Sequence, residues 1–250
     1  MPNVLFEVRD NVALLSLNNP EKRNILSLSV CDQIVDYVRQ AEADPEVKAL
    51  IVTGTGAVFC AGGELKDLTP NRQVLEKIYS GFLSIANCTV PTIAAVNGPA
   101  VGAGFNLAVG CDVRLVTEAA RFEPRFFGLG LHPGGGNTWM LRQLANWNTA
   151  AGMLLFSQSL SGGEAVEKGL AWKSVKADCL IEEAFKFTAN IRQLPKELLL
   201  RTKQTLRLAG GTNSHREILD RETVEQLWSI DQPYARKSIA AMGEKISSKR

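Results

Sequence analysis

The chain has little of what marks secreted, membrane-spanning and metal-binding proteins. Its 250 residues include only five cysteines and two histidines. The cysteines are odd in number, scattered and without a CxxC pair, which argues against a disulfide framework or a zinc site and favours a reduced, cytoplasmic setting. No run of about 18 apolar residues occurs, so we expect no transmembrane helix. The N-terminus lacks the basic and apolar stretches of a signal peptide, so we expect none.

Strong charge of one sign is also missing. The formal net charge is +2, charged residues make up 22% of the chain and the hydrophobic set 45%. These values are ordinary for a soluble globular protein and give no argument for nucleic acid or a membrane surface as a partner. The length suffices for one sizeable core, alone or with a small helical appendage.

Hydrophobic patterning predicts an α/β protein. A hairpin is expected around Asp10 and Asn11, and a helix capped by Ser27 or Ser29 should follow. Buried strands alternate with further helices, which indicates β-α-β units. The expected strands cover residues 4–8, 12–17, 47–53, 92–96, 113–116 and 170–175.

The C-terminal part is predicted to be helical only. Amphipathic patterns cover residues 180–194, 196–208, 215–228 and 233–246. This change of pattern predicts a boundary near Pro195, with a core over residues 1–194 and a helical region over 195–250.

Two glycine-bearing segments each follow a buried strand and lead into a helix. They are residues 59–67, with Gly62 and Gly63, and residues 97–108, with Gly102 and Gly104. Such turns leave backbone N–H groups free at a helix start, where the helix dipole also favours negative charge. Two of them side by side can point two N–H groups at one carbonyl oxygen, which would form an oxyanion hole. The alternative is that the glycines only make tight turns.

Five segments, in order along the chain, resemble the crotonase family, also called the enoyl-CoA hydratase/isomerase superfamily. One such motif alone would be weak, but the ordered set is specific. The resemblance implies a spiral of β-β-α units with a C-terminal helical region that builds homotrimers or hexamers. It implies an acyl-CoA thioester ligand, with coenzyme A as part of the substrate and no permanently bound cofactor or metal. The segments are residues 23–26, 52–63, 91–112, 130–136 and 160–170.

The resemblance also assigns main-chain groups and a coenzyme A surface. The N–H groups of Gly63 and Ala103 fall on the family's two oxyanion donors. Lys66 and Arg23 could each reach a phosphate, although solvated cations are the commoner case. The residues predicted to contact coenzyme A are Arg23, Ala61, Gly63, Glu64, Leu65 and Lys66.

The acid/base positions depart from the family's pattern. Hydratases of the family hold one water with two glutamates, and here those positions are Asn106 and Phe126. Isomerases can use a glutamate just after a loop proline, and here that position is Gly134. An amide can bond a water or a substrate but cannot move a proton near neutral pH. General acid–base catalysis typically supplies about 10²–10⁴-fold, so we expect ordinary hydration to be weak or absent.

Three other residues are candidates for the site. His132 lies in the glycine-rich segment 130–136, called the glycine loop below. It carries the side chain best suited to proton transfer near neutrality, unless it only bonds a backbone carbonyl. Glu123 is the carboxylate nearest to the missing pair of glutamates, but a Glu–Arg pair with Arg125 would be structural. Trp139 follows the glycine loop and could line an acyl pocket together with Phe126, or belong to the core.

These observations leave three functions open. The first, which we favour, is an enoyl-CoA hydratase/isomerase-family enzyme of fatty acid metabolism, a lyase or isomerase. It would stabilise a thioester enolate while His132 or Glu123 handles the proton. The second is a catalytically silent acyl-CoA-binding protein, and the third is a scaffold subunit.

Overall fold

The computed structural model describes residues 2–212 and 214–247. The chain folds into two compact units, Met1–Arg192 and Gln193–Arg250. The division lies close to the boundary predicted near Pro195.

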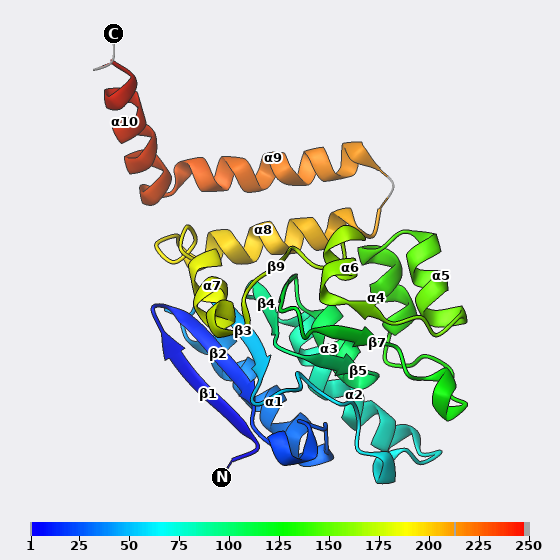
Figure 1. Cartoon of the computed structure of the whole chain (residues 1–250). Coiled ribbons are helices and arrows are strands. Elements are labelled where there is room, and N and C mark those ends of the chain that lie inside the picture. Colours follow the sequence, from blue (N-terminus) through cyan, green and yellow to red (C-terminus); the bar gives the residue numbers. More distant parts are fainter. Residues whose placement is uncertain (1, 213, 248–250) are drawn as a thin grey trace. The chain divides into compact units, whose positions relative to one another are not determined.

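Unit 1 is built on a six-stranded sheet in the order β1-β2-β3-β4-β6-β9 (Figure 1). Only the β1–β2 pair is antiparallel, and every other neighbouring pair is parallel. The hairpin turn has φ of 51° at Asp10 and 62° at Asn11, which are left-handed values typical of a two-residue hairpin and confirm that prediction. The strands are β1 (Val4–Arg9), β2 (Val12–Leu17), β3 (Ala49–Gly54), β4 (Thr92–Val96), β6 (Val113–Val116) and β9 (Lys173–Ser174).

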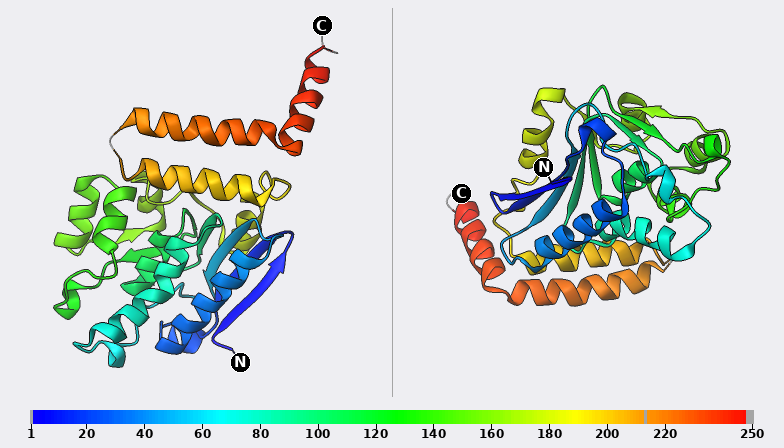
Figure 2. Two further views of the ribbon diagram at one scale, coloured as in Figure 1. Left: turned by 180° about the vertical axis from the view of Figure 1, so that it is seen from behind. Right: turned by 90° about the horizontal axis from the view of Figure 1, so that it is seen from below.

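Helices cover both faces of this sheet. Helix α7 (Leu180–Phe187) packs Leu180, Ala184 and Phe185 against alternate residues of β2, β3, β4 and β6. Helices α1 (Leu28–Ala43) and α3 (Ala103–Gly110) lie on the other side, as the view from below shows (Figure 2). Because strands of a parallel sheet are buried on both faces, their sequences read as unbroken apolar runs.

The structure contains a second sheet, of three strands, which the sequence did not predict. It consists of β5 (Pro99–Val101), β7 (Arg121–Glu123) and β8 (Leu160–Ser161). Strands of two or three residues are too short to carry a periodic signal. This sheet matters because β5 leads directly into α3 through Gly102.

The remaining helices of unit 1 are α2 (Arg72–Asn87), α4 (Asn137–Leu144), α5 (Trp147–Leu155) and α6 (Gly162–Glu167). Helix α2 packs against both α1 and α3. Helix α6 begins at a capping box, in which Ser161 and Glu164 bond each other's backbone N–H.

Unit 2 contains α8 (Lys196–Ala209), α9 (His215–Asp231) and α10 (Pro233–Ser247), which confirms the predicted helices. Helices α8 and α9 contact each other along their lengths (Figure 1). Arg201 on α8 bonds Glu225 on α9 over 3.0 Å and lies over the ring of Trp228. None of the helices in the described part of the chain is long and apolar enough to cross a membrane.

Candidate functional site

The two glycine segments lie side by side in unit 1. Cys60 and Ala100 form an isolated parallel β-bridge, and the N–H of Val101 donates to the carbonyl oxygen of Cys60 over 2.9 Å. A second bridge joins Gly63 of the first segment to Leu26. The structure therefore brings the first segment against β5, immediately before the start of α3.

Gly62 permits a close approach between these segments. Its φ is +104°, and a Cβ there would lie 2.9 Å from the carbonyl oxygen of Val101 and 3.7 Å from the amide nitrogen of Ala103. A larger residue would push the two segments apart.

Two main-chain donors remain available beside this approach. Ala103 is the first residue of α3, so its N–H has no intrahelical partner. Within residues 2–212 and 214–247, neither this N–H nor that of Gly63 donates to a protein acceptor. Buried or half-buried backbone donors are normally paired, so two unpaired ones in adjacent loops indicate a place for a ligand acceptor.

The residues predicted to contact coenzyme A lie along the first segment or are bonded to it. The Nζ of Lys66 pairs with Oε1 of Glu64 over 2.9 Å, and this hydrogen bond and the carboxylate charge raise the pKa of the exposed Lys66. Leu65 is exposed. The carbonyl of the exposed Arg23 accepts from the N–H of Ala61 over 3.0 Å. Both cations are therefore accessible to a phosphate.

Asn106 is held in place on both sides of its amide. The side chain is 2% exposed on α3. Its Nδ2 donates to the carbonyl oxygen of Gly134 over 3.0 Å, and its Oδ1 accepts from Nδ2 of Asn137 over 2.6 Å. A carboxylate at this position would set an oxygen against the Gly134 carbonyl, so the surroundings suit an amide.

Asn137 was missed by the sequence analysis. It is the first residue of α4 and is 1% exposed. Its Oδ1 is buried and has no hydrogen-bond partner among the described residues. Its place directly after the glycine loop was the only available signal, and nothing in the sequence pairs it with Asn106.

The glycine loop 130–136 packs closely against α2. A Cβ at Gly135 would lie 2.3 Å from Cζ of Phe82, and one at Gly134 would lie 2.5 Å from Oη of Tyr79. On the adjoining side, Ile78 of α2 lies 3.9 Å from the Cβ position of Gly63. Helix α2 thus lies against both Gly63 and the loop that carries the predicted isomerase position.

Glu123 is engaged by two arginines. Its carboxylate pairs with Nε of Arg121 at 3.4 Å and with Arg125. Its carbonyl oxygen accepts from the N–H of Gly102 over 2.9 Å, which ties β7 to the start of α3. These contacts describe a residue that shapes the loop, and a proton-transfer role for it stays a prediction.

His132, Phe126 and Trp139 are placed around the glycine loop with different exposures. His132 is exposed and its Nδ1 lies 2.7 Å from the carbonyl oxygen of Pro133. Phe126 is half-buried and precedes a 3-10 turn, Phe127–Leu129. Trp139 on α4 is 65% exposed. No hydrogen bond among the described residues joins His132 to Gly63, Ala103 or Asn106. The predicted roles of all three residues stay predictions.

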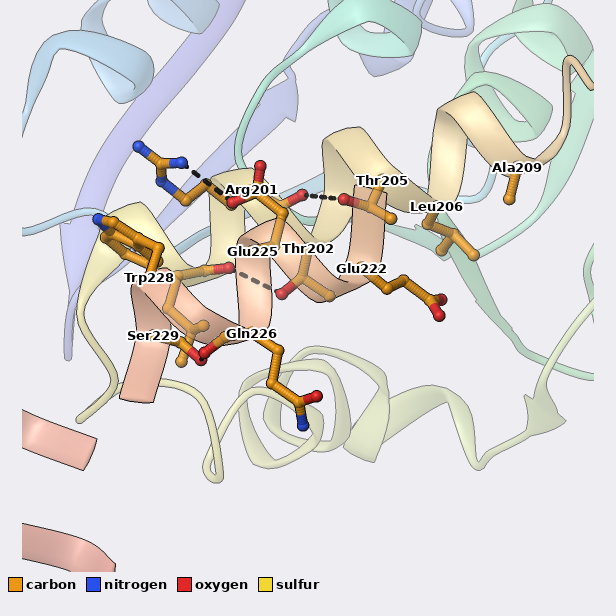
Figure 3. A pocket seen from close by; sticks show the side chains of 11 residues that line it. Arg201, Thr202, Thr205, Leu206, Ala209, Glu222, Glu225, Gln226, Trp228 and Ser229 are labelled. Carbon is orange, nitrogen blue, oxygen red and sulfur yellow. Dashed lines mark hydrogen bonds and ion pairs between the residues drawn. The ribbon is translucent and has the colours of Figure 1, made fainter. Parts of the chain in front are cut away.

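Two grooves of the structure lie away from the residues predicted for the site. One of about 440 Å³ runs between α8 and α9 in unit 2, and the Arg201 side chain that lines it is already paired with Glu197 and Glu225 (Figure 3). Another, in unit 1, is lined by residues of β1 and α7 with Arg9 and Arg192. Neither contains a residue predicted for the site. In the described part of the chain no group of three His, Cys, Asp or Glu residues is placed to hold a metal ion.

Comparison with known proteins decides the family. The family model described as enoyl-CoA hydratase/isomerase matches residues 7–248. The chain belongs to this family. The predicted crotonase resemblance and the fold class are therefore confirmed.

Relatives of the enoyl-CoA hydratase/isomerase family cover most of the chain. A probable enoyl-CoA hydratase of Mycobacterium tuberculosis, EchA14, is 41% identical over 216 residues, 84% of each chain. The 1,2-epoxyphenylacetyl-CoA isomerase of Escherichia coli is 33% identical over 231 residues, 89% of this chain and 88% of that one. The crystal structure of an enoyl-CoA hydratase from Polaromonas has a TM-score of 0.89 at 29% identity and covers 97% of both chains.

Proposed function

We propose that this family member binds an acyl-CoA thioester and stabilises its enolate with the N–H groups of Gly63 and Ala103. The observation that carries the proposal is the pair of unpaired main-chain donors in two bridged segments. Fixed backbone donors reorganise little as negative charge develops on the thioester oxygen, and removing one such donor typically costs about 10²–10³ in rate.

Coenzyme A is expected along the first glycine segment. Lys66 and Arg23 would meet phosphate groups, while Ala61, Glu64 and the exposed Leu65 would line the adenine and pantetheine. This placement is supported by the exposure of both cations and by the bond between Arg23 and Ala61. The E. coli relative is named for an acyl-CoA isomerisation and the mycobacterial one as a probable hydratase, so both names agree on a CoA thioester.

The reaction itself is expected not to be ordinary hydration. Asn106 and Phe126 stand where the two glutamates would be, and the amide of Asn106 is held by Gly134 and Asn137. An enolate formed at the oxyanion hole is common to isomerisation and to exchange of the α-proton, neither of which needs an activated water.

The decisive experiment replaces the amide hydrogen of Ala103. Proline is tolerated at the first position of a helix, where its missing N–H has no intrahelical role. Ala103→Pro should therefore leave the fold intact and slow deuterium uptake at the α-carbon of acyl-CoA thioesters in D2O about 10²-fold or more. Uptake is measured by mass spectrometry with butyryl-, octanoyl- and phenylacetyl-CoA.

Two controls accompany this variant. Ala103→Gly keeps the N–H and should retain most of the exchange rate. His215→Pro makes the same change at the exposed first residue of α9 in unit 2 and should leave exchange unaltered. An Ala103→Pro variant that exchanges the α-proton as fast as the wild type would refute the oxyanion assignment.

A silent acyl-CoA-binding protein is the second candidate, because all three usual carboxylate positions are neutral here. Calorimetric titration with the same thioesters distinguishes it. Binding by the wild type with no exchange and no turnover would establish this candidate in place of the first.

A further inference from the structure

Tyr79 lies where the site lacks a proton-bearing group. Its Oη would be 2.5 Å from a Cβ at Gly134, the position just after the loop proline. The residue before it, Ile78, lies 3.9 Å from the Cβ position of Gly63. The Tyr79 hydroxyl is therefore close to the loop that lacks the carboxylate, on a helix that also lies against Gly63.

The Tyr79 side chain is half-buried, and its ring is fixed while its hydroxyl is not. The ring packs against Phe82, with centroids 5.6 Å apart. The hydroxyl makes no hydrogen bond to any of the described residues. No protein group in residues 2–212 and 214–247 therefore competes for the phenolic O–H, and a ligand beside the glycine loop could bond it in place of solvent water.

The space beside Gly134 fits the Tyr79 hydroxyl in place of a side chain at residue 134. A side chain at residue 134 and the Tyr79 hydroxyl cannot both occupy the same volume without a shift, because a Cβ contact of 2.5 Å is shorter than real ones. Because residue 134 is a glycine, the Tyr79 hydroxyl can occupy this volume.

We propose that Tyr79 contacts the acyl chain and serves as its proton donor and acceptor, in the role that a carboxylate after the loop proline would otherwise fill. This inference rests on the proposed function. The substrate class is an acyl-CoA whose carbon next to the thioester exchanges a proton through an enolate.

Proton transfer begins at the phenolic O–H bond, which breaks as its proton goes to the enolate carbon. A C–H bond forms with the enolate's electron pair, and the thioester C=O is restored. The phenolate left behind takes a proton from water. In the reverse direction a phenolate takes the α-proton and becomes the phenol. The C–H electron pair forms the C=C bond of the enolate, and the C=O π pair moves to the oxygen held by Gly63 and Ala103.

Tyr79→Phe tests this role because it deletes one oxygen and keeps the ring against Phe82. Exchange of the α-proton in D2O should fall about 10²–10⁴-fold, while the affinity for the same thioesters and the melting temperature stay near wild type. The matched control is Tyr37→Phe, another half-buried tyrosine, whose ring stacks on Phe6 of β1 with centroids 4.9 Å apart. It should leave exchange unchanged.

A rescue variant separates chemistry from packing. Gly134→Glu alone should gain nothing, because the new side chain meets the Tyr79 hydroxyl. The double change Tyr79→Phe with Gly134→Glu frees that space and supplies a carboxylate, so exchange should recover over Tyr79→Phe alone. A purely structural role for the hydroxyl would not be rescued by an acid at residue 134.

The outcomes are distinguishable. Exchange that is unchanged in Tyr79→Phe would overturn this inference and leave the oxyanion proposal standing. A wild type that shows no exchange with any of the thioesters would overturn the proposed function and this inference together. Loss of thioester binding in Tyr79→Phe, with exchange at saturation intact, would overturn the proton-transfer role and reassign the hydroxyl to binding only.

Discussion

Asn106 illustrates, at the scale of one residue, what the structure adds to a sequence motif. A sequence motif places it where a hydratase glutamate is expected, and the structure adds that both ends of its amide are used. The Nδ2 bonds Gly134 and the Oδ1 bonds Asn137. An amide bonded at both ends orients a loop and moves no proton, so the residue links α3 to the start of α4.

Cys60 of the first glycine segment and Cys31 of α1 illustrate how burial controls reactivity at the residue scale. Burial raises the pKa of Cys60 and of Cys31 to about 12. A raised thiol pKa means less thiolate at a given pH, and the thiolate is the reactive form. Cys60 therefore adjoins the proposed oxyanion segment without being a nucleophile.

We expect one fast-reacting thiol in the native protein. Cys179 is exposed, whereas Cys31, Cys60, Cys88 and Cys111 are buried. Titration with a disulfide reagent at about pH 8, near the ordinary cysteine pKa, should give one equivalent quickly and all five only after unfolding. The hydrogen bond to Asp178 raises the pKa of Cys179, so its rate should rise further with pH. Cys179→Ser should abolish the fast phase, and a fast phase that persists would contradict the burial of the others.

At the scale of elements, the glycine loop 130–136 depends on particular glycines. Gly135 has φ of +66°, and a Cβ there would lie 2.3 Å from Phe82 and 2.9 Å from Nδ2 of Asn106. Gly136 has φ of +79° but nothing within 4 Å of its Cβ position. The two neighbours share a left-handed backbone and differ in the space around it.

This difference predicts unequal costs for the same substitution. Gly136→Ala should lose only about 1–2 kcal/mol of unfolding free energy, the usual cost of a left-handed L-residue. Gly135→Ala should lose about 1–3 kcal/mol more, because it also overpacks the contact with α2. Urea unfolding curves of both variants measure the difference, and equal costs would mean that α2 is not held against the loop.

The elements that a long periodic pattern specifies were predictable, and those that depend on distant contacts were not. Strand β4 and helix α8 follow from apolar spacing, and Ser27 caps α1 as its sequence indicates. Strand β5 was missed because three residues carry no period. Arg114 of β6 is only 5% exposed. The burial of its charge is compensated because its guanidinium donates to the carbonyl oxygens of Leu170 and Cys111.

The candidate site divides in the same way. The glycine segments and Asn106 were visible because a family motif surrounds them. Tyr79 and Asn137 were not, because each matters only through a neighbour that is remote in sequence. Tyr79 lies next to the apolar face of α2, and without the fold nothing distinguishes its hydroxyl from an exposed one.

At the scale of the whole molecule, unit 2 carries an unusual amount of exposed apolar surface. Leu206, Val224, Leu227, Ile239 and Met242 are each more than half exposed. Large exposed apolar surface is typical of an interaction site, which supports the expectation that this helical region joins subunits into a trimer or hexamer.

A charged side chain placed in this surface should therefore dissociate the expected trimer or hexamer. Leu227 is 65% exposed on α9, and Leu227→Glu would have to bury a carboxylate in an apolar interface. Light scattering after gel filtration should give a trimeric or hexameric mass for the wild type and a smaller one for this variant. His215→Glu adds a carboxylate at the exposed first residue of the same helix and should keep the wild-type mass. A monomeric wild type would refute the oligomer prediction.

The unpaired amides of Gly63 and Ala103 belong to the main chain, and this has a consequence for how the protein can change over time. Mutation alters side chains, and apart from proline no residue removes a backbone N–H. Every side chain around the proposed oxyanion hole can therefore be exchanged while both donors persist. In the proposed site the fold thus keeps the two donors, and it leaves the positions proposed for proton transfer and packing, Asn106, Phe126, Gly134 and Tyr79, open to variation.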